Sequence, residues 1–259
     1  MSTDPFSLFS LKGKTALVTG ASTGIGYAVA QTFAYAGADI ALGYYSSPTA
    51  IQIAADLAKA AGVTVEAFKC PVDDPDAVAS TFSSALEKFG KIDIVVSNAG
   101  ITWTGGELIA PPDHKEWKQI MDVNIDGNYY VAKEAGKVFK AQGYGSLIFT
   151  SSISALIVNV PQRQAAYNVS KAAVTHLARC LAVEWASFAR VNCVSPGYTL
   201  TEITKFADHD MKEEWRQRIP MGREALPVEL VGAYLYLASN ASTYTTGSDI
   251  VVDGGYTVI

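Results

Sequence analysis

The residues whose types and spacing best suit chemistry are Tyr167 and Lys171, which stand four positions apart in Tyr-Asn-Val-Ser-Lys. In a helix this spacing puts both side chains on one face, one turn apart. An ammonium beside a phenol stabilises the phenolate, so we expect the pKa of Tyr167 to lie below its ordinary value of about 10. Such a tyrosine can give or take a proton near neutral pH. Because Tyr-x-x-x-Lys also occurs as an ordinary helix-surface pair, the rest of the chain must decide between the two interpretations.

A glycine-rich turn near the start of the chain predicts a nucleotide site. A compact apolar run over residues 15–19 is followed by Gly-Ala-Ser-Thr-Gly-Ile-Gly and then by a helical pattern that ends at Ala36. In a strand–turn–helix context, glycines let the backbone approach a pyrophosphate, and the free N–H groups of the new helix receive its charge. The alternative is a tight turn without a ligand. The predicted contacts are Gly20, Ser22, Thr23, Gly24, Ile25 and Gly26.

The end of the second predicted strand, residues 39–44, bears on the choice of dinucleotide. A carboxylate there usually binds the ribose 2′-hydroxyl of NAD. Here the chain reads Gly-Tyr-Tyr-Ser-Ser, with no carboxylate to repel a 2′-phosphate. Tyr44 ends the strand, and the hydroxyls of Ser46 and Ser47 can accept hydrogen bonds from or donate them to that phosphate. We therefore predict NADP(H) rather than NAD, although no arginine stands at this point.

Strand and helix patterns alternate along the whole chain. Strands are predicted over residues 15–19, 39–44, 64–69, 93–97, 146–151, 190–194 and 249–252, and helices over 48–61, 74–89, 113–140, 164–188 and 227–239. This alternation predicts an α/β fold: a single doubly wound Rossmann domain whose central parallel seven-stranded sheet is flanked by helices on both faces. The domain is expected to cover residues 1–259, with a leader at 1–12 and a polar flap on the substrate side at 199–223.

Several polar residues follow the predicted strands directly. Ligands of doubly wound folds bind outside the carboxyl ends of the strands, so these residues should meet in one crevice. Tyr167 and Lys171 open the helix after the fifth strand and should face the same crevice. This joint occurrence, more than any single motif, favours a catalytic site. The strand-end residues are Asn98, Ala99 and Gly100, then Ser151 and Ser152, then Pro196 and Gly197.

Composition excludes several other classes. The chain has 259 residues, 49% of them hydrophobic, and a net charge of −5 with no basic run, so nucleic acid is not an expected partner. Cys70, Cys180 and Cys193 are scattered and are predicted to be reduced core thiols, and the three histidines have no metal-ligand spacing. No stretch is long enough to span a membrane, and the first residues do not resemble a signal peptide. A cytoplasmic protein that binds a small molecule is expected by default.

The chain resembles the short-chain dehydrogenase/reductase family from Gly13 to Gly255. The resemblance implies that Tyr167 is the general acid in carbonyl reduction and the base in the reverse reaction. Lys171 would hold the nicotinamide ribose and depress the tyrosine pKa, Ser152 would hydrogen-bond the substrate oxygen, and Asn124 would hold a water that relays protons to Lys171. Val72, Thr199 and Thr201 are the further cofactor contacts that it implies. The resemblance rests on Thr19-Gly20-x-x-x-Gly24-x-Gly26, Asn98-Ala99-Gly100, Asn124, Ser152, Tyr167-x-x-x-Lys171 and Pro196-Gly197.

Two departures from the family pattern matter. The usual spacing of twelve residues between serine and tyrosine points to Ser154, whereas counting along the fifth strand points to Ser152 with a two-residue loop insertion. Strand register is constrained while loops tolerate insertions, so we choose Ser152 and expect Ser154 to be a pocket or capping hydroxyl. In the second departure, Pro71 replaces an aspartate that often holds adenine. Asp73 is offset by two positions, which leaves its adenine role open, and Val72 would contribute its backbone.

A narrower resemblance concerns fungal NADP-dependent mannitol dehydrogenases and the related sorbose and xylulose reductases. It rests on Ser-Ser-Ile-Ser-Ala at 151–155, Val-Pro-Gln-Arg-Gln at 160–164, Tyr-Asn-Val-Ser-Lys at 167–171, Glu-Trp at 184–185 with Phe-Ala-Arg-Val-Asn at 188–192, Ile-Pro-Met-Gly-Arg at 219–223 and Ala-Ser-Thr-Tyr-Thr-Thr-Gly at 241–247. This resemblance implies interconversion of a ketose and a polyol. The candidate substrate residues are Ser152, Ile153, Asn159 and Tyr198, with Trp103 as a further possibility.

Two alternatives and an assembly remain open. The apolar run at 155–158 allows a reductase of bulkier apolar or aryl ketones, and a catalytically silent dinucleotide-binding protein could use the same fold. The resemblance also implies a homotetramer formed through the two long helices and the C-terminal segment. An apolar stripe on the helix from Gln164 fits such contacts, although in a monomer it would face the core. The stripe consists of Val169, Ala172, Ala173 and Leu177.

Overall fold

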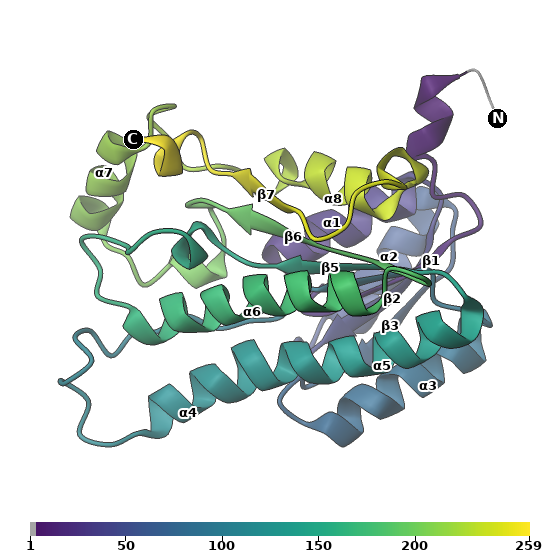
Figure 1. Cartoon of the computed structure of the whole chain (residues 1–259), viewed down its shortest axis with the longest axis horizontal. Helices are drawn as coiled ribbons and strands as arrows, with labels where there is room; N and C mark the ends of the chain where they lie inside the picture. Colours follow the sequence, from purple (N-terminus) through teal and green to yellow (C-terminus); the bar gives the residue numbers. More distant parts are fainter. Residues whose placement is uncertain (1–3) are drawn as a thin grey trace.

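A seven-stranded parallel sheet forms the centre of the molecule, as the computed structural model, which describes residues 4–259, shows in Figure 1. The order of the strands is β3-β2-β1-β4-β5-β6-β7, and each neighbouring pair is parallel. The chain runs outward from β1 to β3 and then returns to place β4 beside β1, which creates the switch point where such folds bind ligands. The predicted fold class is confirmed. The strands are β1 Thr15–Val18, β2 Asp39–Tyr44, β3 Val65–Lys69, β4 Ile94–Ser97, β5 Ser146–Thr150, β6 Arg190–Pro196 and β7 Asp249–Val252.

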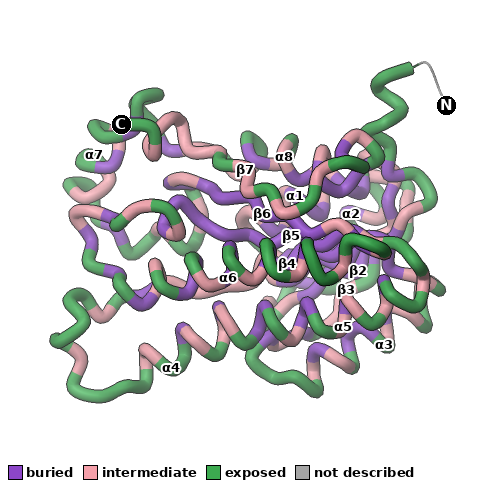
Figure 2. The backbone as a smooth tube through the Cα atoms, viewed as in Figure 1, coloured by how far each residue is buried: buried purple, intermediate pink, exposed green. Residues whose placement is uncertain are grey.

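Helices cover both faces of the sheet (Figure 1). On one face lie α1 (Gly24–Tyr35), α2 (Ala50–Ala61) and α8 (Val231–Ala238), and on the other lie α3 (Pro75–Phe89), α5 (Gly127–Gln142) and α6 (Ala165–Glu184). Alternate strand residues serve opposite faces, because successive side chains of a strand point to opposite sides. Val18 packs into the first apolar layer and its neighbour Leu17 into the second. Figure 2 shows the resulting buried centre.

The helix ends follow local sequence signals. The Asp74 carboxylate accepts hydrogen bonds from the N–H groups of Asp76 and Ala77 at the start of α3, at 2.9 and 3.2 Å. Gly90 ends the same helix with a φ of 76°, a conformation that glycine adopts without steric cost. The helix observed between these two residues agrees with the one predicted over residues 74–89.

The long helix predicted over residues 113–140 is divided by a π-helical turn. It consists of α4 (Lys115–Met121), a π-helical turn at Asp122–Asp126 and α5. Asn124 lies in the π turn and is completely buried. A π turn inserts one extra residue into a helix and often occurs where a side chain must be placed for function.

The segment at 199–223, predicted as a flap, contains a 3-10 turn at Glu202–Thr204 and α7 (His209–Arg218). Figure 1 shows α7 beside the C-terminal turn at one end of the sheet. The Asp208 carboxylate caps α7 by accepting a hydrogen bond from the Met211 N–H at 2.9 Å. Trp215 is the buried residue of α7 and joins the segment to the body of the protein.

The prediction for the cysteines is wrong at one position. Cys70 and Cys193 are buried, but Cys180 is exposed on α6. It shares the outer face of this helix with His176 and Val183, because residues three and four apart lie on one side. The sequence around Cys180 is apolar although this face is not covered by the sheet.

Other parts of the chain add little to the site. The predicted leader includes an exposed 3-10 turn at Pro5–Phe9, and residues 1–3 lie outside the described part. Within residues 4–259 no helix has the length and apolarity needed to cross a bilayer. The same residues contain no group of three or more His, Cys, Asp or Glu side chains that could hold a metal ion.

Candidate active site

A crevice of about 700 Å³ opens at the carboxyl ends of the strands. Most of the residues that the sequence singles out line it. Those attributed to the cofactor are Gly20, Ser22, Thr23, Gly24, Ile25, Ser46, Ser47, Val72, Asn98, Ala99, Gly100, Pro196, Gly197, Thr199 and Thr201. Tyr167, Lys171, Ser152, Ile153, Asn159 and Tyr198 line the same crevice. Gly26, Tyr44 and Asn124 do not.

The glycine turn between β1 and α1 forms one wall. Gly20 has a φ of 62°, which favours glycine, and the first N–H groups of α1 have no side-chain cap, because Thr23 makes no capping hydrogen bond. Those N–H groups lack intrahelical partners and can bind an anion. Gly26 lies behind the wall, where a Cβ atom would lie only 2.5 Å from Asn98 Nδ2. It serves the close approach of helix and turn, so its contribution to the crevice is indirect.

Asn98 fixes this wall to the strand ends. Its Nδ2 donates to the carbonyl oxygens of Thr19 at 3.0 Å and Gly20 at 3.3 Å, and its Oδ1 accepts from the Thr150 hydroxyl at 3.1 Å. The side chain therefore ties together residues that follow β1, β4 and β5. The sequence motif Asn-Ala-Gly carries a positioning amide as well as a cofactor wall.

The end of β2 differs in one residue from the prediction. Tyr44 packs on the apolar layer and does not line the crevice, because the alternation of the strand turns its side chain inward. Tyr45, Ser46, Ser47 and Pro48 line the crevice instead. Asp73 also lines it, so a carboxylate does reach this part of the wall from the segment after β3.

Tyr167, Ser152 and Lys171 converge inside the crevice. Ser152 lies beside the Tyr167 phenol and lowers its pKa. The Lys171 ammonium lies 5.6 Å from the centre of the Tyr167 ring and donates to the Thr150 carbonyl oxygen at 2.9 Å. The helical spacing of four thus brings phenol and ammonium together as the sequence predicts.

The electrostatics of this group differ from the prediction. Burial raises the pKa of Tyr167 to about 12, and the Ser152 hydrogen bond lowers it by a smaller amount. Burial also lowers the pKa of Lys171 to about 8. The expected depression of the tyrosine pKa is absent because desolvation of the phenolate is the largest influence, and Ser152, not Lys171, is the group that opposes it. At neutral pH Tyr167 is therefore a neutral phenol, which is the form that donates a proton.

The two candidate serines are hydrogen-bonded to each other. The Ser152 hydroxyl donates to Ser154 Oγ at 3.0 Å, and its Oγ accepts from the Ser154 N–H at 3.1 Å at the start of a 3-10 turn. The Ser154 hydroxyl in turn donates to Asn159 Oδ1 at 2.7 Å. Of the two serines, Ser152 is the one that influences the pKa of Tyr167.

Asn124 lies behind the catalytic group. Its Oδ1 accepts from the Ile101 N–H at 2.9 Å, and its Nδ2 donates to the Ile101 carbonyl at 2.9 Å and to the Ser170 hydroxyl at 3.1 Å. A Cβ added to Gly100 would lie 3.3 Å from this Oδ1 and 3.6 Å from Lys171 Nζ, so the two groups are neighbours. Because protein groups hold the Asn124 amide on both sides, Asn124 is suited to position the helix that carries Lys171.

The structure adds residues that the sequence did not single out. Gln162, Gln164, Phe206 and Trp215 all line the crevice. Gln162 and Gln164 belong to the Val-Pro-Gln-Arg-Gln stretch at 160–164, but sequence reasoning assigned neither of them a role in the site, and Phe206 and Trp215 lie in no motif. Conversely, Trp103 lies in a separate apolar cluster with its indole N–H donating to the Gly106 carbonyl at 2.8 Å. The apolar run at 155–158 does not line the crevice either, and Leu156 and Val158 are exposed.

Fold and site together define a Rossmann-type protein in which Tyr167 and Lys171 line a crevice at the carboxyl ends of the strands. The family whose description is enoyl-(acyl carrier protein) reductase matches residues 20–257. A probable NADP-dependent mannitol dehydrogenase of Yarrowia lipolytica is 58% identical over 248 residues, which are 96% of this chain and 89% of the relative. A sorbose reductase of Candida albicans is 58% identical over 251 residues, with the same two shares.

A solved structure of a reductase is also similar to this chain over its whole length. The NADPH-dependent 3-quinuclidinone reductase from Rhodotorula rubra superposes with a TM-score of 0.95 at 44% identity, over 100% of this chain and 97% of that one. The chain belongs to the short-chain dehydrogenase/reductase family.

Proposed function

We propose that this protein is an NADPH-dependent carbonyl reductase that reduces a ketose to a polyol and catalyses the reverse oxidation. The observation that carries the proposal is the convergence of the Tyr167 phenol, the Ser152 hydroxyl and the Lys171 ammonium in one crevice. The names of the two relatives, a mannitol dehydrogenase and a sorbose reductase, support the substrate class.

The residues of the crevice fit a dinucleotide. Gly20 leaves room for a backbone–phosphate approach, the uncapped start of α1 suits a pyrophosphate, and Ser46 and Ser47 provide hydroxyls for a 2′-phosphate. When bound, NADPH would supply the hydride for the carbonyl carbon. The phosphate preference is also supported by the name of the mannitol dehydrogenase relative.

The side chains supply the proton and the orientation. Tyr167 is neutral at pH 7 and would donate its proton to the carbonyl oxygen as negative charge develops there. Ser152 would hydrogen-bond the same oxygen, since it lies beside the phenol in the crevice. Lys171, with a pKa of about 8, is mostly protonated at pH 7 and would stabilise the tyrosinate that is left. Asn124 would keep Lys171 and its helix in place, with the relay of protons through a water as its proposed second role.

The polar wall of the crevice favours a polyhydroxy substrate. Asn159, Gln162 and Gln164 are buried amides that line it. A second candidate substrate class, bulkier hydroxyl-free ketones, is favoured by the similarity to a 3-quinuclidinone reductase and by the apolar wall of Ile153 and Phe206. Comparing kcat/KM for fructose, sorbose and xylulose with that for 3-quinuclidinone and aryl ketones distinguishes the two. Activity on aryl ketones with none on the three sugars would overturn the ketose proposal.

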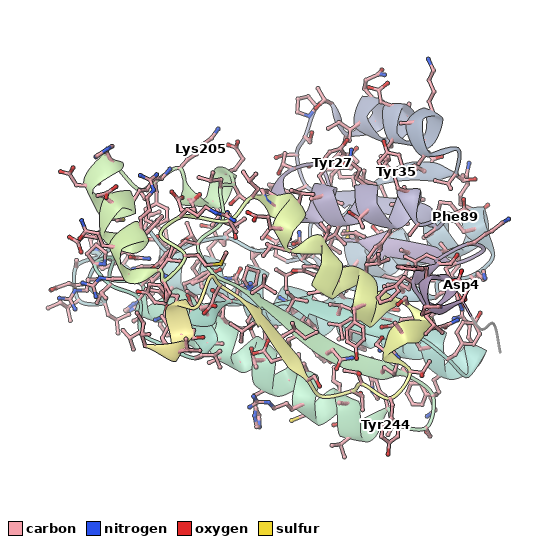
Figure 3. All side chains as sticks on the ribbon, turned by 90° about the horizontal axis from the view of Figure 1, so that it is seen from above. Asp4, Tyr27, Tyr35, Phe89, Lys205 and Tyr244 are labelled. Atoms are coloured by element: carbon pink, nitrogen blue, oxygen red, sulfur yellow. The ribbon has the colours of Figure 1, made fainter. Side chains whose placement is uncertain are left out.

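The mechanism is tested by Tyr167→Phe, which removes the proton donor and keeps the ring. We expect NADPH oxidation by ketose to fall at least about 100-fold, within the range typical of general acids, while NADPH binding measured by fluorescence is retained. Tyr35→Phe is a matched control, because Tyr35 is exposed on α1, away from the crevice (Figure 3). Unchanged turnover in Tyr167→Phe refutes the mechanism. NADPH binding without turnover in the unmodified protein would instead favour a catalytically silent binding protein.

We also propose a homotetramer. Val169 and Val183 on α6 are 50% and 80% exposed, and an apolar helix face of this kind is suited to contact a second copy. Figure 3 shows Tyr244, which is fully exposed, at the edge of the molecule. Light scattering coupled to size exclusion measures the assembly, and a mass of one chain, 27.5 kDa, would contradict the proposal.

A further inference from the structure

A chain of hydrogen bonds runs along the polar wall of the crevice, from the segment after β5 to the buried tryptophan of α7. The Trp215 indole N–H donates to Gln162 Oε1 at 2.9 Å. Gln162 Nε2 donates to the Tyr198 hydroxyl at 3.0 Å, and Asn159 Nδ2 donates to the same hydroxyl at 3.1 Å. The rings of Trp215 and Tyr198 stack at 4.1 Å and 10°. All four residues line the crevice and none is more than 8% exposed.

Trp215 determines which way the Gln162 amide points. An indole N–H is a donor only, so the amide atom that faces it must be the oxygen. If the amide turned over, two N–H groups would face each other at Trp215. Gln162 is therefore held with its nitrogen toward Tyr198 and the crevice.

The Gln162 nitrogen has one N–H left over. It carries two, and one of them is used by Tyr198. Within residues 4–259 no second partner of this nitrogen is recorded. The Tyr198 oxygen already accepts from both amides, and the Tyr198 ring packs edge-on against that of Tyr256 at 5.4 Å. The wall therefore offers a fixed amide donor to a ligand oxygen.

We propose that Gln162 determines specificity by donating its free Nε2–H to a hydroxyl oxygen of a polyhydroxy ketone, and that Trp215 is the positioning residue that fixes the direction of this donor. This rests on the proposed ketone reduction and deepens it. A hydroxyl-free ketone has no oxygen beyond its carbonyl for this N–H, and the carbonyl is held by Tyr167 and Ser152. Gln162 thus discriminates between the two candidate substrate classes.

The competing explanation is that this chain of hydrogen bonds only stabilises the fold. Two variants distinguish that explanation from a role in specificity. Gln162→Leu removes the donor at nearly constant volume, and Trp215→Phe removes the anchor while keeping an aromatic ring against Tyr198. Trp185→Phe is the matched control, since Trp185 stacks on Phe188 near the end of α6 and does not line the crevice. KM and kcat are measured for a ketose and for a hydroxyl-free ketone, together with NADPH affinity by fluorescence.

We expect the KM for the ketose to rise about 10-fold in Gln162→Leu and about 3-fold in Trp215→Phe, in the range given by loss of one neutral hydrogen bond. The kcat, the NADPH affinity and the kinetics with the hydroxyl-free ketone should stay within about 2-fold, and Trp185→Phe should match the unmodified protein. A ketose KM that does not change, or an equal loss on both substrates, overturns the role of Gln162 and leaves the proposed function intact. Failure of the unmodified protein to oxidise NADPH with any ketose overturns both.

Discussion

Replacement of Lys171 by methionine should make the protein more stable at neutral pH while abolishing its activity. Lys171 is 3% exposed, and burial lowers its pKa from 10.5 to about 8. At about 1.4 kcal/mol per pKa unit, this corresponds to roughly 3 kcal/mol of destabilisation by the buried charge. Methionine has a similar length, carries no charge and suits an apolar site. The substitution also removes the hydrogen-bond donor of the Thr150 carbonyl, and this loss offsets part of the gain in stability.

The sign of the pH dependence isolates the lysine. Below pH 8 the side chain is protonated in both the folded and the unfolded state, and the destabilisation is complete. Between pH 8 and 10.5 the unfolded state holds the proton and the folded state does not, so the free energy of unfolding rises with pH. Other groups titrate in this range, but they are common to both proteins. The stability advantage of Lys171→Met should therefore shrink by about 2 kcal/mol between pH 7 and pH 10.

Urea unfolding of both proteins at one protein concentration, at pH 7 and at pH 10, measures how the difference in their free energies of unfolding changes with pH. NADPH oxidation with a ketose checks the loss of activity in the same preparations. If the two proteins follow parallel pH profiles to within about 0.5 kcal/mol, the charge on Lys171 is solvated, and our account of its pKa is refuted. A variant that is less stable at pH 7 but shows the predicted change with pH would locate the error in the Thr150 hydrogen bond alone.

Two further predictions concern residues whose roles the structure separates. Ser152→Ala should lower kcat about 100-fold or more, as for loss of a donor to a developing oxyanion. Ser154→Ala should lower kcat less than about 10-fold, because the Ser154 hydroxyl donates to Asn159. A larger loss in Ser154→Ala than in Ser152→Ala would reverse the assignment of the two serines. Gly26→Ala would bring a Cβ to 2.5 Å from Asn98 Nδ2, so we expect about 1–3 kcal/mol of destabilisation in urea unfolding and weaker NADPH binding by fluorescence. Gly232→Ala in α8 has open space and should be neutral or slightly stabilising, and equal behaviour of the two glycine variants would contradict the close-approach argument.

Much of the architecture follows from local sequence signals. The apolar run at 15–18, the glycine turn and the helix after it are each specified by neighbours within a few residues, and so is the capping of α3 by Asp74. General rules for parallel sheets predict the doubly wound arrangement once the alternation is read, whereas the order of the strands comes from the structure. The same rules bring the residues after β1, β4, β5 and β6 into one crevice. Tyr167 and Lys171 could therefore be assigned to that crevice from the sequence.

Other features depend on contacts that no local pattern encodes. Gln162 and Trp215 are 53 positions apart, and their hydrogen bond exists only because α7 packs against the segment after β5. The pKa of Tyr167 is raised because burial outweighs the effect of Ser152, and burial depth is set by the whole fold. For the same reason Cys180 is exposed despite its apolar neighbours.

One physical reason separates the features that the sequence predicts from those that only the structure shows. Period, turn chemistry and strand-end position are properties of consecutive residues, and they determined the fold, the glycine turn and the helix that presents Tyr167 beside Lys171. Desolvation and hydrogen bonds between distant segments are properties of the packed chain. These decided the protonation of the tyrosine, the hydrogen bonds that join Ser152, Ser154 and Asn159, and the direction in which the Gln162 amide faces the crevice.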